Sequence, residues 1–226
     1  MKFELVLQPS IADLGIDNWV GRYQTPRMRR IIFCLLASGV FAPMSCAQQA
    51  PVGIPVFQLS QPPDSKITFS VKASVPIDGV FEKWDASLTF TSADAEAGVL
   101  DIKVDAASVN TGSGMKDGKL KGKDFFDVKD NPYITFHSSK IEQTGPNTVL
   151  VTGTFTIRGV SKPETLTFTL SGKGTGAGEI KGIMAFDRKD YGMNASIPFM
   201  KIADRVEVGV DIKGKRVSGP PLVFKQ

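Results

Sequence analysis

The chain has 226 residues and a formal net charge of +4, from 27 lysines and arginines against 23 aspartates and glutamates. This length allows one sizeable domain or two small ones, and the basic residues form no concentrated stripe of the kind that binds nucleic acid. The single histidine excludes zinc sites that are built from two histidines.

The first predicted element is a secretory signal peptide at residues 28–47. Arg29 and Arg30 precede an apolar run from Ile31 to Met44, and a small-x-small cleavage sequence follows. The apolar run is too short to span a bilayer as a finished helix. We therefore expect cleavage near Ala47 and a periplasmic or secreted mature protein.

Residues 1–27 precede this signal, although an export signal normally begins a chain. We interpret them as a mis-assigned N-terminal extension, with Met28 as the true start; a functional extension is the alternative. Both cysteines, Cys34 and Cys46, lie before the expected cleavage site, so the mature chain needs no disulfide. Lipid attachment to Cys46 is left open, although the usual preceding leucine is absent.

Residues 48–63 are rich in proline and glutamine and are interpreted as a linker with one short strand near 56–59. From residue 64 to residue 226 we expect a single β domain. Apolar and polar residues alternate there in a series of runs, a pattern typical of antiparallel strands with one buried face. The runs are 67–75, 100–106, 133–138, 149–157, 166–170 and 206–212.

Turn sequences separate these runs, among them PIDG, SADAEAG, QTGPN, RGVSKP and GKGTGAG. Helical periodicity is limited to one short helix or helical turn within 115–126. About eight strands after residue 55 therefore predict an all-β fold, closed as a barrel or folded as a two-sheet sandwich.

The predicted strands place many of the 15 phenylalanines on inward positions. Phenylalanine has no polar tip, so an interior lined with it is dry and cannot position a polar substrate. The pattern alone favours an ordinary packed core over a hydrophobic ligand cavity. The inward candidates are Phe69, Phe90, Phe136, Phe155, Phe168 and Phe186.

No catalytic or metal-binding residue is predicted. His137 alternates with Phe136 and is expected on the outer face of its strand, and no G-x-S-x-G sequence supplies a serine nucleophile. Asp124, Asp127 and Asp130 lack the spacing of a calcium loop and fit turn positions instead. A paired-carboxylate hydrolase is left open, but nothing selects one pair of acids.

Three basic residues, Lys119, Lys121 and Arg188, are candidates for the mouth of a barrel. There they would receive an anionic head group while an apolar tail enters the interior. Solvated surface charge is an equally good interpretation of all three.

Four longer segments carry a resemblance when they are taken together and in order: SVNTGSGMKDGKLKGKDFFDVKDNPYITFHSSKI, VTGTFTIRGVSKPETLTFTL, FDRKDYGMN and DRVEVGVDIKG. They resemble the YceI-like family of polyisoprenoid-binding proteins, over roughly residues 56–213. The resemblance implies an extended, lipocalin-like antiparallel β-barrel that is exported to the periplasm. It also implies a long isoprenoid chain held in a hydrophobic tunnel, with neither enzymatic activity nor a cofactor.

Matching the family motifs residue by residue gives further expected ligand contacts beside the six phenylalanines and the three basic residues. Two departures concern the head group. Lys-Leu-Lys stands at 119–121 where many relatives have His-Leu-Arg, and Lys-Ala-Ser stands at 72–74 where a histidine is common. Ammonium groups bind phosphate as point charges, so the head group is not fixed by the resemblance. The added residues are Phe125, Phe126, Tyr191 and Met193.

The leading hypothesis is a non-catalytic carrier or sequestering protein for a long isoprenoid lipid with an anionic or quinone head group. Transient membrane contact and a homodimer are left open, and nucleic acid is not expected as a partner. The alternatives are a secreted hydrolase or isomerase that acts on a hydrophobic substrate, and a ligand-free structural or stress-induced module.

Overall fold

The computed structural model describes residues 53–195 and 201–225, which belong to a unit that comprises residues 47–226. The expected N-terminal extension 1–27, the signal peptide 28–47, both cysteines and the start of the linker lie outside the described residues. These four expectations stay predictions.

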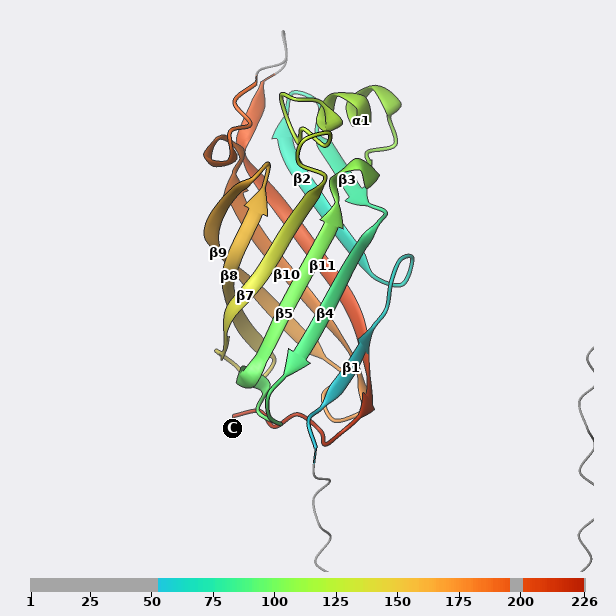
Figure 1. Cartoon of the computed structure of the whole chain (residues 1–226), viewed down its shortest axis with the longest axis vertical. Coiled ribbons are helices and arrows are strands. Elements are labelled where there is room, and N and C mark those ends of the chain that lie inside the picture. Colours follow the sequence, from blue (N-terminus) through green and yellow to red (C-terminus); the bar gives the residue numbers. More distant parts are fainter. Residues whose placement is uncertain (1–52, 196–200, 226) are drawn as a thin grey trace, which may run out of the picture. The chain divides into compact units, whose positions relative to one another are not determined.

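One antiparallel sheet accounts for most of the described chain (Figure 1). It contains eleven strands, β1 Val56–Leu59, β2 Lys66–Ala73, β3 Ile77–Phe81, β4 Trp84–Phe90, β5 Gly98–Asp105, β6 Val109–Asn110, β7 Tyr133–Gln143, β8 Thr148–Ile157, β9 Val160–Ser171, β10 Ala177–Asp187 and β11 Ile202–Ser218. Three short 3₁₀ turns, Ala95–Ala97, Ala106–Ser108 and Arg188–Tyr191, and one helix, α1 Gly114–Lys121, complete the described elements. The predicted lipocalin-like all-β fold with one short helix is confirmed.

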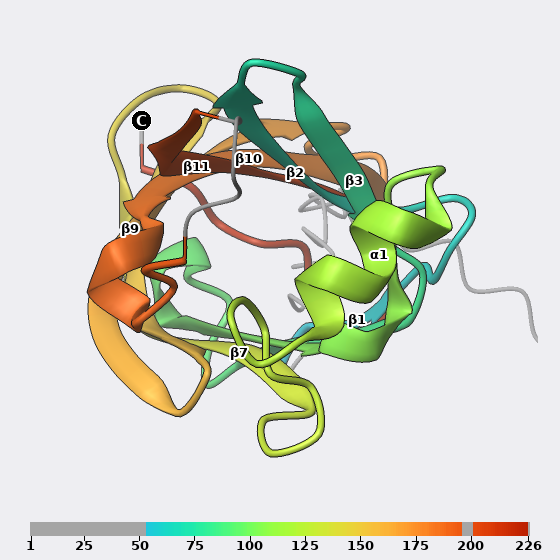
Figure 2. The ribbon, with the colours of Figure 1, turned by 90° about the horizontal axis from the view of Figure 1, so that it is seen from above.

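The sheet curls on itself, with β4 and β6 at the two ends of its path. Its order is β4-β5-β7-β8-β9-β10-β11-β2-β3-β6, and β1 also pairs with β11. Strand β5 continues through the turn Ala106–Ser108 into β6, which pairs with β3, so the chain itself connects the β4–β5 end of the path to its β3–β6 end. The strands consequently surround an interior, as Figure 2 shows from above.

The alternation of apolar and polar residues determines which side chains face this interior. The six phenylalanines predicted to point inward are all buried, and so are most apolar residues that share their strand faces. The strand predicted near 56–59 is β1; the structure has eleven strands rather than about eight, and the short strands β3 and β6 match none of the predicted runs. The predicted PIDG turn is wrong: its Ile77 and Gly79 belong to β3, where Ile77 is buried.

Strand β7 contains a bulge that changes which residues face the interior. The pairing of β7 with β8 shifts between Ser138 and Lys140. Ser138 is buried, and its hydroxyl accepts a hydrogen bond of 2.8 Å from the backbone N–H of Leu100 on β5. Phe136 before the bulge and Ile141 after it are both buried, although strict alternation would place them on opposite faces.

Helix α1 and the turns after it lie at one end of the barrel (Figure 2). Asp117 accepts hydrogen bonds from both the N–H and the hydroxyl of Thr111, at 2.8 and 2.6 Å, and these bonds lower the pKa of its carboxyl. The following turns bury Phe125 and Phe126, and the Phe126 ring packs against that of Phe81 at 5.8 Å between centroids. Asp130-Asn131-Pro132 leads into β7, as predicted.

The C-terminal residues 219–225, which we call the strap, cross the opposite end of the barrel (Figures 1 and 2). The backbone N–H of Val223 donates to the carbonyl of Ala93, and that of Ala95 donates to Val223, at 2.8 and 3.0 Å. Lys225 exchanges two hydrogen bonds with the side chain of Gln143, and its ammonium pairs with the carboxylate of Glu96. The strap is therefore anchored on the far side of the opening from β11, where it begins.

Candidate functional site

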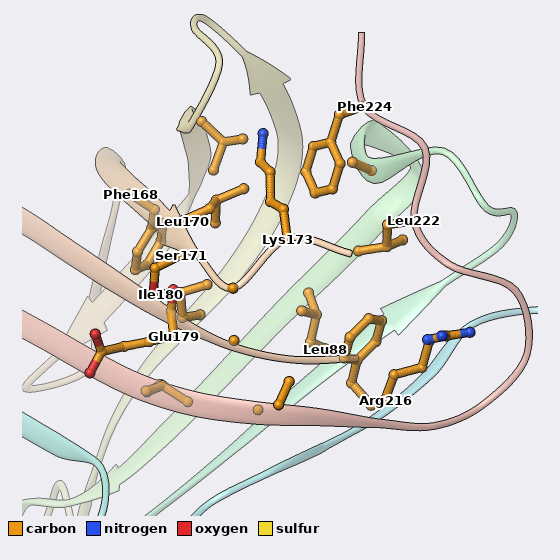
Figure 3. Close-up of a pocket in the computed structure, with 18 of the residues that line it drawn as sticks. Leu88, Phe168, Leu170, Ser171, Lys173, Glu179, Ile180, Arg216, Leu222 and Phe224 are labelled. Carbon is orange, nitrogen blue, oxygen red and sulfur yellow. Dashed lines mark hydrogen bonds between the residues drawn. The ribbon is translucent and has the colours of Figure 1, made fainter. Parts of the chain in front are cut away.

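The larger interior cavity lies at the strap end of the barrel and has a volume of about 160 Å³. Apolar side chains from widely separated strands form its wall (Figure 3). They include Leu88 and Phe90 of β4, Phe168 and Leu170 of β9, Ile180 of β10 and Ile212 of β11. The cavity is therefore suited to hydrocarbon.

The mouth of this cavity, which we call the strap-end mouth, is formed by the strap and by the glycine-rich turn between β9 and β10. Leu222 and Phe224 of the strap line the cavity, and the Lys173 ammonium lies 3.9 Å from the centre of the Phe224 ring (Figure 3). Arg216 also borders the cavity, and its guanidinium donates to the carbonyl of Gly219 at 2.5 Å. Two cations thus flank the strap-end mouth, and each has a partner on or beside the strap.

A smaller cavity of about 70 Å³ lies at the α1 end. Phe125, Phe126 and Leu120 border it from α1 and the turns after it, while Phe69, Phe155 and Phe186 border it from the strands. Among the described residues that line this cavity, all are apolar except Arg188. Apolar spaces thus lie at both ends of the interior that residues 53–195 and 201–225 form.

Several interior phenylalanines lie over a glycine of the neighbouring strand. Phe168 is the register partner of Gly182, and a Cβ at Gly182 would lie 2.2 Å from Cε1 of the Phe168 ring. Phe69 covers Gly79 in the same way, with 2.5 Å between the corresponding atoms. Since no side chain separates ring and strand, these rings lie against the barrel wall.

The phenylalanines predicted from alternation and from the family motif divide between the two cavities. Phe90 and Phe168 line the larger one, and Phe69, Phe125, Phe126, Phe155, Phe186 and Met193 line the smaller one. Phe136 and Tyr191 are buried but line neither cavity. Whether any of them contacts a ligand stays a prediction.

Tyr191 forms part of the wall packing. Its ring meets those of Phe155 and Phe186 edge to face, at 5.5 and 5.1 Å between centroids. Its hydroxyl donates to Glu164 at 2.9 Å. Burial, followed by this bond to a carboxylate, raises the pKa of Tyr191 far above its ordinary value.

The three basic residues predicted for a mouth have different surroundings. Arg188 is 6% exposed; it pairs with Asp204 at 3.1 Å and donates to the carbonyls of Ala203, Met193 and Ala195. The guanidinium of Arg188 is therefore bonded to partners inside the protein. Lys119 pairs with Asp124 at 2.7 Å and lowers the pKa of that carboxyl, and Lys121 lies at the end of α1. The structure thus brings none of the three to the strap-end mouth.

His137 lies on the outer face of β7, as predicted. Its side chain is 65% exposed and its Nδ1 lies 2.5 Å from the Asp101 carboxylate. Over residues 53–195 and 201–225, no three His, Cys, Asp or Glu side chains gather where they could hold a metal ion. In the same part of the chain, no helix is long and apolar enough to cross a membrane.

Sequence reasoning missed the residues of the strap-end mouth. Phe57 and Leu59 of β1 line the larger cavity, as do Leu222 and Phe224, but none of the four is among the predicted ligand contacts. The alternate positions of Phe57 and Leu59 in β1 could have predicted that both side chains face the interior. The tail after residue 218 has no such pattern, because its position depends on contacts with Glu96 and Gln143 far along the chain.

The sequence matches a family model described as a YceI-like domain over residues 60–214. A UPF0312 protein of Pseudomonas savastanoi pv. phaseolicola is 36% identical over 98 residues, which are 43% of this chain and 51% of the relative. A UPF0312 protein of Ectopseudomonas mendocina is 31% identical over 96 residues, 42% and 50% of the two chains. The chain spans about half the length of the curated relatives it matches.

Two solved structures are similar in fold. BcnA of Burkholderia cenocepacia has a TM-score of 0.60 at 30% identity, covering 66% of this chain and 95% of that chain. A polyisoprenoid-binding domain from Saccharophagus degradans has a TM-score of 0.55 at 14% identity, covering 72% and 99%. Because the family model covers more than half of its residues, the chain belongs to the family of proteins with a YceI-like domain.

Proposed function

We propose that this protein binds the apolar chain of a lipid in its interior, and that the lipid is an isoprenoid which the protein carries or sequesters after export. The observation that supports this most directly is the larger cavity, whose wall is largely apolar, with leucine, isoleucine and phenylalanine side chains prominent in it. The shared fold of the Saccharophagus degradans domain, whose description names polyisoprenoid binding, is consistent with it.

Burial of hydrocarbon would supply most of the affinity. Each buried methylene group contributes about 0.8 kcal/mol before the entropic cost of ordering the chain. A cavity of 160 Å³ is similar to the roughly 150 Å³ apolar cavity that holds one benzene molecule. This space suits the end of a chain, so a longer chain requires movement of the side chains around it.

Lys173 and Arg216 are better placed than Lys119 and Lys121 to meet a polar head group, since both border the larger cavity. An anionic or quinone head group at the strap-end mouth is part of the proposal. Export to the periplasm, transient membrane contact and a homodimer remain predictions that rest on the sequence.

Lipid binding can be tested with the protein purified from its natural host. Native mass spectrometry should show a co-purifying lipid mass, and the delipidated protein should take up a fluorescent apolar probe that farnesol and geranylgeraniol displace. Spectra without any lipid mass, together with no uptake of probe or prenol, would exclude the proposed function.

A matched pair of variants on β10 locates the binding space. Ile180 lines the larger cavity, whereas Ile183 is 68% exposed on the outer face. Ile180→Asp should weaken probe binding at least tenfold, because it buries a carboxylate against hydrocarbon. Ile183→Asp should leave binding unchanged; equal affinities for both variants would place the ligand elsewhere.

A further inference from the structure

Between the two cavities lies a layer of buried side chains that lines neither of them. We call this layer the septum; it consists of Ile67, Ile102, Phe136, Leu166, Met184 and Val210. Each member comes from a different strand, from β2, β5, β7, β9, β10 and β11 respectively. All six have at most a few per cent of their surface exposed.

Strand register pairs four members of the septum with one another. Ile67 is the register partner of Val210, and Ile102 is the partner of Phe136. On β10, Met184 lies between Ile180, which lines the larger cavity, and Phe186, which lines the smaller one. On β11, Val210 lies between Ile212 and Val208 in the same way.

The septum therefore lies between the two spaces. Along β8, the lining residues run from Val149 at the larger cavity to Ile157 at the smaller one. At about 3.3 Å per residue, this stretch measures about 26 Å. With the septum closed, an apolar chain entering at the strap end is stopped partway along this length.

Met184 is the septum member best able to move. It is unbranched, with three rotatable side-chain bonds, whereas four of the other members are branched aliphatic residues. The ring of Phe136 is confined against β8, because a Cβ at Gly153 would lie only 2.7 Å from its Cζ. A rotation of Met184 thus opens the passage with the least disturbance of the wall.

We propose that the septum determines the length of apolar chain that the protein accepts, and that Met184 is the residue that opens or closes it. The inference rests on the proposed function, because chain length matters only if a lipid chain enters the interior. With Met184 in place, short prenyl chains fill the larger cavity and additional isoprene units add little affinity. Without its side chain, longer chains gain the second cavity.

The chain-length dependence of binding tests this directly. Geraniol, farnesol, geranylgeraniol and solanesol are titrated against a bound fluorescent probe in the unaltered protein and in Met184→Ala. We expect the affinity of the unaltered protein to level off by farnesol, and that of Met184→Ala to keep rising, with at least a tenfold gain for geranylgeraniol. The same length dependence in both proteins would overturn the inference.

Val109→Ala controls for a general loosening of the core, because Val109 is buried but lines neither cavity and is not in the septum. It should keep the length dependence of the unaltered protein. If Met184→Ala does not fold, as judged by thermal melting, Met184→Val supplies a milder opening with the same direction of change.

Xenon binding in crystals distinguishes failure of this inference from failure of the proposed function. The unaltered protein should take up xenon in the two cavities but not at the level of Met184, and Met184→Ala should add a site between them. That xenon pattern without prenol binding would reject the lipid function and retain the septum. Xenon at the septum level in the unaltered protein, or no added site in Met184→Ala, would reject the septum.

Discussion

A phenylalanine ring that lies over a glycine occupies the wall of a barrel and leaves its centre accessible. Phe69 over Gly79 and Phe168 over Gly182 are arranged in this way, one bordering each cavity. The aromatic content of the interior therefore adds hydrophobic surface without filling it completely. The absence of a side chain at these glycines is as important for the cavities as the rings themselves.

Gly182→Ala should reduce both stability and binding. The new Cβ would lie 2.2 Å from Cε1 of Phe168, so the ring must move toward the larger cavity. Overpacking of this kind typically lowers the free energy of unfolding by about 1–3 kcal/mol, which urea denaturation measures, and probe affinity should fall about tenfold.

Gly118→Ala is the matched control, because Gly118 lies in α1 with no atom near a new Cβ. It should raise the free energy of unfolding by up to about 1 kcal/mol, from helix propensity, without a change in binding. Equal binding losses in the two variants would contradict the role assigned to the Phe168 ring.

The inward phenylalanines could be predicted because alternation alone decides the face of a strand on which they lie. Their glycine partners could not, because pairing Phe168 with Gly182 requires the register of β9 and β10. The surroundings of Arg188 were also out of reach, since its ion pair with Asp204 and its three carbonyl partners depend on a loop geometry that no local pattern encodes.

Among the elements, the strap is the one whose contacts connect it to ligand exchange. It contributes Leu222 and Phe224 to the larger cavity while its end is held by the pairing of Lys225 with Glu96. Because the strap lies beyond residue 214, it falls outside the range matched by the family model. It is therefore a feature of this chain that the family match does not describe.

Glu96→Gln should accelerate both entry and release of an apolar probe, measured by stopped-flow fluorescence, with a smaller change in equilibrium affinity. The Lys225 ammonium, together with the N–H of Gln143, lowers the pKa of Glu96 below its ordinary 4.5. The anchor is thus complete above pH 4.5 and is lost as the pH falls through the lowered pKa of the folded state. Exchange in the unaltered protein should accelerate over that range, while Glu96→Gln should show no such step.

Lys119→Gln provides the control for this experiment, because it removes an exposed ion pair with Asp124 at the α1 end of the barrel, opposite the strap anchor. Its exchange rates should match those of the unaltered protein. If Glu96→Gln also exchanges at the unaltered rate, the strap does not control the strap-end mouth.

Helices and strands could be predicted where their residues follow a regular hydrophobic period. They could not be predicted where tertiary contacts determine the backbone conformation. The helix expected within 115–126 was found at Gly114–Lys121, followed by turns. The PIDG sequence has the composition of a turn, yet Ile77 and Phe81 are buried on one face of β3 and Gly79 accommodates the ring of Phe69. Burial of these two side chains outweighs the local turn preference.

For the whole molecule, ligand binding should appear as added thermal stability. A prenol present at 100 times its dissociation constant stabilises the folded state by about 2.7 kcal/mol if it does not bind the unfolded chain. For a domain of this size that corresponds to an increase in Tm of about 5–10 °C, measurable by differential scanning calorimetry. The increase should persist in Ile183→Asp and disappear in Ile180→Asp; an increase in both would indicate binding outside the larger cavity.

The barrel as a whole could be predicted from alternation and from the family resemblance, but its divided interior could not. Whether six inward side chains close a passage depends on their levels along eight or more strands, and a shift of one residue in any register changes those levels. Cavity volume is a small difference between large packed volumes, so no local pattern in a sequence encodes it.

The bulge in β7 has a consequence for comparing related sequences. Because the inward face changes phase between Ser138 and Ile141, this one strand contributes Ile134 to the smaller cavity and Ile141 to the larger one. In a relative, gain or loss of one residue at the bulge would exchange the inward and outward faces of β7 on one side of the bulge only. If β7 has the same number of residues, both halves keep their inward faces. An alignment gap at Ser139 therefore identifies relatives in which β7 presents its other set of side chains to one of the two cavities.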